Sequence, residues 1–165
     1  MAWVRRRRPT TGRREELLRD EAAGWEGLTA LVDGLDAREL EVPGVTPDGW
    51  SVKDVAWHVA AWSRDTARVL REIAAGTWNG IDPSSEPGWT DRTNAEWFER
   101  SRAMAPGDVS AELRAAREDL LGAFGELDEL TPDADEWFEE TGPTHYAKHL
   151  EDLEPWVAAL RRGRG

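Results

Sequence analysis

The chain has 165 residues, a length that fits one ordinary domain. Hydrophobic residues make up 39% of it and charged residues 33%, so a core can form beneath a strongly ionised surface. The absence of cysteine excludes disulfides, thiolate metal sites and a cysteine nucleophile, and it agrees with a reducing compartment.

The charge of the chain is unevenly distributed. The net charge is −12, and six arginines precede the first acidic residue, so the remainder is more acidic still. Such a domain repels phosphate backbones, and we expect no nucleic-acid partner for the folded part. We interpret residues 1–12, which contain the run Arg5 to Arg8, as a disordered basic leader, with a nucleic-acid or membrane patch as the alternative. No stretch has the apolar length of a membrane span or signal peptide, which predicts no membrane partner and a cytoplasmic location.

Hydrophobic periodicity predicts an all-α chain, because β-branched residues are sparse and sustained alternation is absent. The first helix is expected over residues 13–31. The second follows Ser51, a favourable N-cap, with Asp54 three residues later near the positive helix end, and it closes at Gly76. Residues 76–91 then form a loop that is too long for a simple connector.

Two further helical regions are expected in the second half of the chain. One starts near Thr93 or Asn94, pauses at Pro106 and Gly107, and resumes up to Leu127. A short acidic turn then reaches Phe138, and the break at Gly142 and Pro143 ends it.

The last helix is expected from Thr144 to about Leu160, with apolar residues at alternating four- and three-residue spacing. Pro155 lies inside this pattern and predicts a kink or a split into two helices. Four long amphipathic helices with one extended connection predict a four-helix bundle over residues 13–162, with a long loop between the second and third helices.

Three histidines occupy informative positions. His58 lies on the inward stripe of the second helix, and His145 and His149 are one turn apart on the last helix. Two imidazoles on one helix and a third from a neighbouring helix form a ligand set for a divalent metal that leaves coordination positions open. The alternative is a surface pair of histidines and a core histidine bonded to a carbonyl.

Three stretches resemble a known superfamily. Residues 49–62, GWSVKDVAWHVAAW, resemble the second-helix motif of the DinB-like metal-binding four-helix bundles. Residues 145–156, HYAKHLEDLEPW, resemble their C-terminal H-x-x-x-H motif. Residues 94–98, NAEWF, resemble the actinobacterial mycothiol-dependent maleylpyruvate isomerase-like and ClbS/DfsB-like branches.

The resemblance implies a DinB-like bundle that holds a divalent metal, zinc or nickel, through His58, His145 and His149. It also implies a thiol S-transferase, isomerase or hydrolase that acts on a small electrophile, with a low-molecular-weight thiol as partner. The excess of arginine over lysine favours a GC-rich actinobacterial genome, in which that thiol is mycothiol. The alternative is a non-catalytic small-molecule-binding or self-resistance module whose metal supports a ligand or the fold. Both a monomer and a homodimer remain open.

Other side chains near the predicted metal site follow from helical spacing. We expect Trp62, Asn94 and Trp156 to wall the pocket, although Asn94 also suits a helix cap. Three carboxylates lie within reach of a ligating imidazole, or serve instead as caps and solvated residues: Asp54, Asp65 and Asp152. Two tryptophans of the long loop either close over a ligand or anchor the loop: Trp78 and Trp89.

Overall fold

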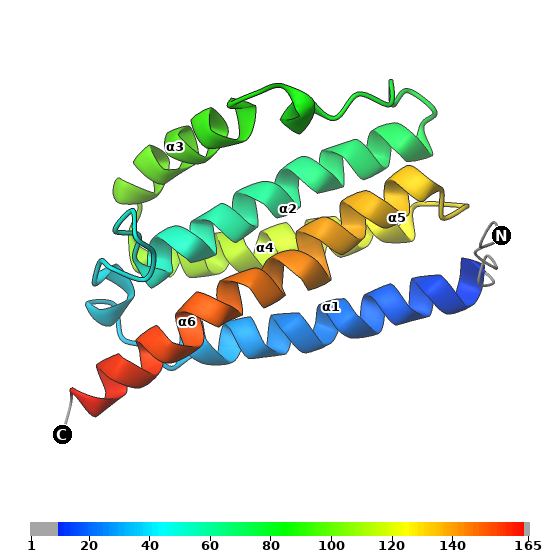
Figure 1. The fold of residues 1–165 in the computed structure, drawn as a ribbon. Coiled ribbons are helices and arrows are strands. Elements are labelled where there is room, and N and C mark those ends of the chain that lie inside the picture. The colour runs from blue at the N-terminus through cyan, green and yellow to red at the C-terminus, as the bar shows by residue number, and fades with distance from the viewer. Residues whose placement is uncertain (1–9, 164–165) are drawn as a thin grey trace, which may run out of the picture.

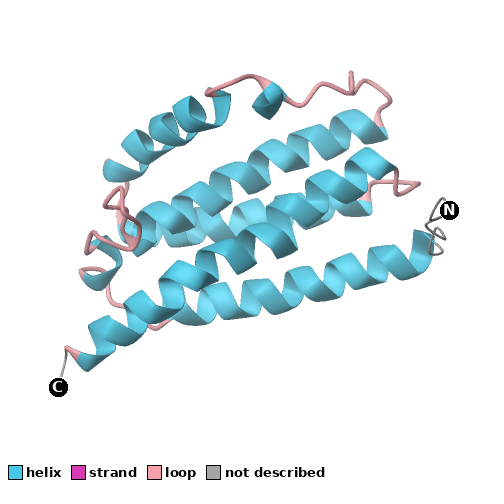
Figure 2. Ribbon diagram, viewed as in Figure 1, coloured by secondary structure: helices cyan, strands magenta, loops and turns pink. Residues whose placement is uncertain are grey.

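The computed structural model describes residues 10–163, which form helices and contain no strand (Figures 1 and 2). The predicted all-α class is therefore confirmed. The α-helices are α1 (Thr10–Asp33), α2 (Val52–Ala74), α3 (Trp89–Arg102), α4 (Pro106–Gly125), α5 (Pro132–Glu139) and α6 (His145–Arg162). Short 3-10 helices lie at Glu39–Glu41 and Pro83–Ser85, and a π-helical segment, Glu140–Thr144, joins α5 to α6. None of these helices combines the length and apolarity needed to cross a membrane.

Four rods form the bundle: α1, α2, α4, and the continuous run of α5, the π-helical segment and α6 (Figure 1). α2 packs against α4, and α1 packs against α6 and the π-helical segment. α3 lies outside this set and runs along α2. The long connection between α2 and α3 is present, and it carries the 3-10 helix Pro83–Ser85. The predicted four-helix bundle is confirmed, with α3 as an additional helix.

α2 is the central helix of the bundle, and its start is strongly fixed. The Ser51 hydroxyl accepts a hydrogen bond from the Asp54 amide at 3.2 Å, while the Ser51 amide donates to the Asp54 carboxylate at 2.8 Å. This capping box satisfies two amides at the helix end that lack partners within the helix. The hydroxyl of Ser101 in α3 donates to the other carboxylate oxygen of Asp54, so the same residue ties α3 to α2.

Two apolar clusters hold the rods together. The larger joins α1, α2, α4 and α6 around residues such as Leu28, Leu113 and Leu153. The smaller joins α1, α2, α4 and α5, and in it the rings of Phe124 and Phe138 stack with centroids 3.9 Å apart. Burial of each such side chain contributes about 1.5–3 kcal/mol. The smaller cluster fixes α5, and therefore the π-helical segment that follows it.

Several predicted boundaries differ from the structure. The third helical region is two separate helices, and α3 begins earlier than expected, at Trp89. The expected break at Gly142 and Pro143 is a π-helical turn, so the helix is wider there but is not interrupted. Of the kink or split expected at Pro155, the split is wrong, because α6 continues through this residue. Because proline has no N–H, the carbonyl of Glu151 lacks its usual helical donor at Pro155. Both residues are exposed, so water can bind that carbonyl instead.

The predicted basic leader covers residues 1–12. Residues 10–12 are the first turn of α1, and residues 1–9 lie outside the part of the chain that the structure describes.

Candidate metal centre

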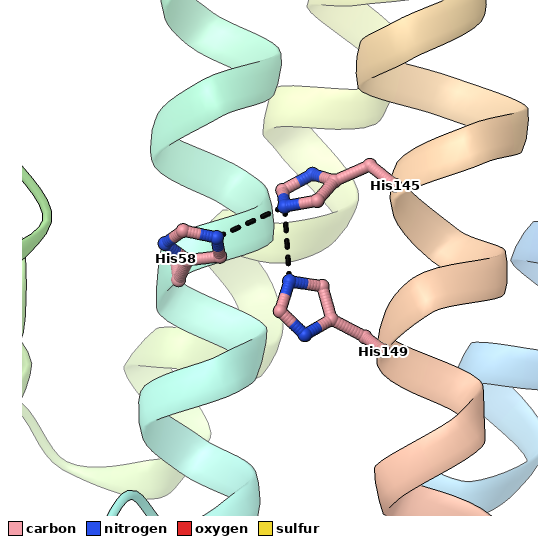
Figure 3. A group of neighbouring side chains, drawn as sticks. All are labelled: His58, His145 and His149. Atoms are coloured by element: carbon pink, nitrogen blue, oxygen red, sulfur yellow. Dashed lines mark hydrogen bonds between the residues drawn. The ribbon is translucent and has the colours of Figure 1, made fainter. Parts of the chain in front are cut away.

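Three imidazoles converge between α2 and α6 (Figure 3). The Nε2 atom of His145 lies 2.9 Å from Nε2 of His58 and 2.9 Å from Nε2 of His149. One ring nitrogen of each histidine lies within 4.8 Å of the other two. The structure thus brings together the three residues that the sequence singles out.

The arrangement fits a metal better than it fits hydrogen bonding among the rings. A neutral imidazole offers one N–H and one lone pair, so Nε2 of His145 can form a full hydrogen bond to only one of its two histidine neighbours. The Nδ1 atoms of His58 and His145 are buried without a hydrogen-bond partner. A cation between the three Nε2 atoms would accept all three lone pairs and leave the protons on Nδ1. The donor set therefore suits a divalent ion such as zinc or nickel.

Burial keeps the three rings neutral. It lowers the pKa of His58 to about 3, and the neighbouring His149 adds to this effect. Burial lowers the pKa of His149 to about 4, with Asp152 acting in the opposite direction and Lys148 in the same one. The pKa of His145 lies well below its ordinary value, chiefly for the same reason. Neutral imidazole is the protonation state that a metal ligand requires.

The backbone around the triad is held from two sides. His58 belongs to the buried part of α2, and the ring of Trp50 meets it edge-on at a centroid distance of 5.1 Å. His145 is the first residue of α6, directly after the π-helical segment. Within that segment the hydroxyl of Thr141 shares a buried hydrogen bond of 2.6 Å with Thr66 of α2. The wide turn before His145 is thereby bonded to the helix that carries His58.

A cavity of about 730 Å³ opens onto the three histidines. Trp62 and Asn94, two of the residues predicted to wall the pocket, line it, and the Trp62 indole donates to the Asn94 side-chain oxygen at 3.2 Å. The structure places Trp156 elsewhere, against Gly44. It follows His149 by seven residues, which is about 10.5 Å along a helix, and this distance carries it past the cavity.

The remaining predicted neighbours of the site have separate roles. Asp54 completes the capping box of α2 with Ser51, and Asp65 pairs with Arg68 at 2.9 Å, so neither orients an imidazole. Asp152 is close enough to His149 to influence its pKa. Trp89 is the first residue of α3 and packs on Trp62 at a centroid distance of 5.9 Å.

Sequence reasoning missed one wall of the cavity. It is formed by residues of α5 and its junction with α6: Asp133, Glu136, Trp137, Glu140, Thr141 and Lys148. The first four are spaced i, i+3, i+4 and i+7, which places them on one helical face. That spacing could have revealed a helical face, but the sequence analysis interpreted the segment as a short acidic turn.

A family model described as the Mycothiol maleylpyruvate isomerase N-terminal domain matches residues 22–152. The match covers most of the chain and includes all three histidines of the triad. No curated protein and no solved structure matches the chain. With its helical bundle and its histidine triad, this chain belongs to the DinB-like family of the Mycothiol maleylpyruvate isomerase N-terminal domain.

Proposed function

We propose that the protein binds zinc or nickel through His58, His145 and His149 and transfers a low-molecular-weight thiol, such as mycothiol, onto a small electrophile. The observation that carries this proposal is the convergence of three neutral imidazoles at the wall of a cavity large enough for a substrate. A divalent ion held there would lower the pKa of a coordinated thiol, so that thiolate is available near neutral pH.

The residues around the triad would hold the substrates. Trp62 covers one side of the cavity and shields the reacting groups from water. Its indole N–H occupies the side-chain oxygen of Asn94, which leaves the Asn94 amide N–H groups to donate to a ligand.

The proposed reaction is a substitution in which every atom is accounted for. The thiol loses its proton to solvent, and the sulfur forms a bond to the electrophilic carbon. The bond from that carbon to the leaving group breaks, and the leaving group departs with the electron pair.

Metal content tests the first half of the proposal. We expect the purified protein to retain about one ion per chain and the His58→Ala variant to lose it, as measured by plasma mass spectrometry. Ser63→Ala is the matched control, because Ser63 is also buried in α2 but lies outside the triad, and its hydroxyl donates to the Val59 carbonyl. Equal metal content in the His58→Ala variant and the wild type would remove the triad as the site.

Turnover tests the second half. We expect the metal-loaded protein to consume 1-chloro-2,4-dinitrobenzene with mycothiol and to release chloride, and to do neither without thiol. Retained metal together with an absence of thiol-dependent turnover would overturn the enzyme proposal and favour the alternative, a binding or self-resistance module.

A further inference from the structure

The part of the cavity wall away from the triad is acidic and aromatic. The wall between the α2–α3 connection and α5 combines carboxylates with indole rings: Trp78, Asp82, Asp133, Glu136, Trp137 and Glu140. This wall, which we call the acidic wall, is built from residues that the proposed chemistry does not use.

α5 separates its acidic residues onto two faces. Asp135 and Glu139 each lie 2.8 Å from the Arg13 guanidinium of α1, so their charges are compensated. Asp133 and Glu136 lie on the cavity face of the same helix, and neither forms an ion pair with any described residue. The uncompensated charge of α5 therefore faces the cavity.

The rest of the cavity does not offset this charge. Among residues 10–163, Lys148 is the single lysine or arginine that lines the cavity, and it lies 3.7 Å from Glu140. Asp82, on the α2–α3 connection, forms no ion pair within the described residues, and its carboxylate accepts from the Ser84 amide at 2.8 Å. Apart from the histidine triad, the described residues that line the cavity include four carboxylates and one lysine, so these side chains together carry a net negative charge.

Aromatic rings stand beside these carboxylates. Trp78 and Trp137 meet at a centroid distance of 5.8 Å with their planes 86° apart. The Trp78 indole donates to the Asp133 carboxylate at 3.0 Å, which fixes the ring beside the charge. Two indoles set edge to face next to carboxylates form the kind of surface that binds organic cations, because the ring faces and the carboxylates are both negative.

We propose that the acidic wall selects an organic cation, so that the electrophile carries an ammonium, guanidinium or heteroaromatic cation and dicarboxylates are disfavoured. This inference rests on the proposed function only in taking the cavity as the substrate site. Recognition by the acidic wall requires no metal, because none of its residues is a histidine of the triad.

Calorimetric titration of the metal-free protein tests the inference with two probes. Phenyltrimethylammonium and benzenesulfonate share a phenyl ring and a tetrahedral head group but differ in the sign of the charge. We expect the ammonium to bind and the sulfonate to bind at least tenfold more weakly. The Asp133→Asn, Glu136→Gln double variant should bind the ammonium about fivefold more weakly for each charge removed. This factor corresponds to the attraction between two unit charges about 4 Å apart in water, about 1 kcal/mol.

The matched control is the Asp135→Asn, Glu139→Gln double variant. It removes the same charge from the same helix on the face turned toward Arg13, and its affinity for phenyltrimethylammonium should equal that of the wild type. Circular dichroism would verify that both variants are folded. The inference is overturned if the wild type binds no ammonium, if the sulfonate binds equally well, or if both double variants lose the same affinity.

The His58→Ala variant separates this inference from the proposed function. It should lose metal and still prefer the cation over the anion. In the wild type, an absence of thiol transfer with cation preference intact would overturn the proposed function alone, whereas turnover combined with anion preference would overturn this inference alone.

Discussion

The phenol of Tyr146, the residue after His145, donates a hydrogen bond to the buried carboxylate of Glu21 at 3.2 Å. Arg117 binds the same carboxylate through two nitrogens, at 2.8 and 2.9 Å. Burial, reinforced by Glu21, raises the pKa of Tyr146, so the phenol stays protonated and remains a donor. The start of α6, which carries His145 and His149, is thus bonded to α1 and, through Glu21 and Arg117, to α4.

Removal of the Glu21 charge should destabilise the fold strongly. Glu21→Gln leaves the partly buried Arg117 without its counter-charge, and we expect a loss of about 3 kcal/mol in the free energy of unfolding. Tyr146→Phe removes one hydrogen bond and should cost about 1 kcal/mol. Urea unfolding measures both, with Glu26→Gln on the exposed side of α1 as a control that changes little. A loss for Glu21→Gln no larger than that of the control would contradict this account.

Two helical glycines should respond in opposite directions to alanine. A Cβ at Gly24 would lie 3.0 Å from the Tyr146 ring, which is fully buried and cannot move away, so Gly24→Ala should destabilise by about 1–3 kcal/mol. A Cβ at Gly122 would meet nothing within 4 Å, so Gly122→Ala should stabilise α4 by about 0.5–1 kcal/mol. Thermal unfolding of both variants checks the signs, and a stabilised Gly24→Ala variant would show that α1 and α6 pack less tightly than described.

A fall in pH should lower the free energy of unfolding of the metal-free protein, because its buried histidines resist protonation. The pKa values of His58 and His149 in the folded chain, about 3 and 4, lie below the ordinary value of 6.5. As the pH falls below about 6.5 the unfolded chain takes up protons first, so stability drops by about 1.4 kcal/mol per pH unit for each such group. Urea unfolding in chelator between pH 7.5 and 4.5 should show a shallower loss for His58→Gln than for the wild type. Equal slopes would mean that the pKa of His58 is the same in the folded and the unfolded chain.

Metal binding should raise the melting temperature. At a free metal concentration of 100 times Kd the folded state gains about 2.7 kcal/mol, which corresponds to about 5–10 °C for a chain of this size. Scanning calorimetry with zinc or nickel added to the chelated protein measures the shift, and the His58→Ala variant should show none. Complete unfolding of the wild type by chelator alone would instead identify a structural metal.

The sequence was most informative where local chemistry decides the structure. The cap at Ser51 and Asp54 placed the start of α2, because a capping box depends on residues three positions apart. The one-turn spacing of His145 and His149 predicted that both rings share a helix face, since this follows from helical geometry alone. The prediction that His58 lies close to this pair needed one further assumption, that the second and last helices are neighbours in the bundle.

Features that depend on contacts between distant segments were harder to predict. The network of Glu21, Arg117 and Tyr146 joins three helices, and no local pattern marks a glutamate of α1 as buried. The π-helical segment read as a break because glycine and proline usually end a helix, whereas here Thr141 and Thr66 bond it to α2. Both misses concern long-range hydrogen bonds.

The indole of Trp78 should control the order of the connection between α2 and α3. The connection touches α5 through the hydrogen bond from Trp78 to Asp133 at 3.0 Å and through the ring contact with Trp137. Trp78→Ala removes both, while Trp78→Phe removes the hydrogen bond and keeps a ring. Because local opening follows from lost contacts, amide hydrogen exchange over residues 75–88 should accelerate most in the alanine variant and less in the phenylalanine variant. Exchange around His145 should not change, since the Thr66 and Tyr146 hydrogen bonds that hold that region are intact in both variants. Unchanged exchange over residues 75–88 in the alanine variant would mean that other contacts of the connection suffice, and that Trp78 serves the cavity rather than the fold.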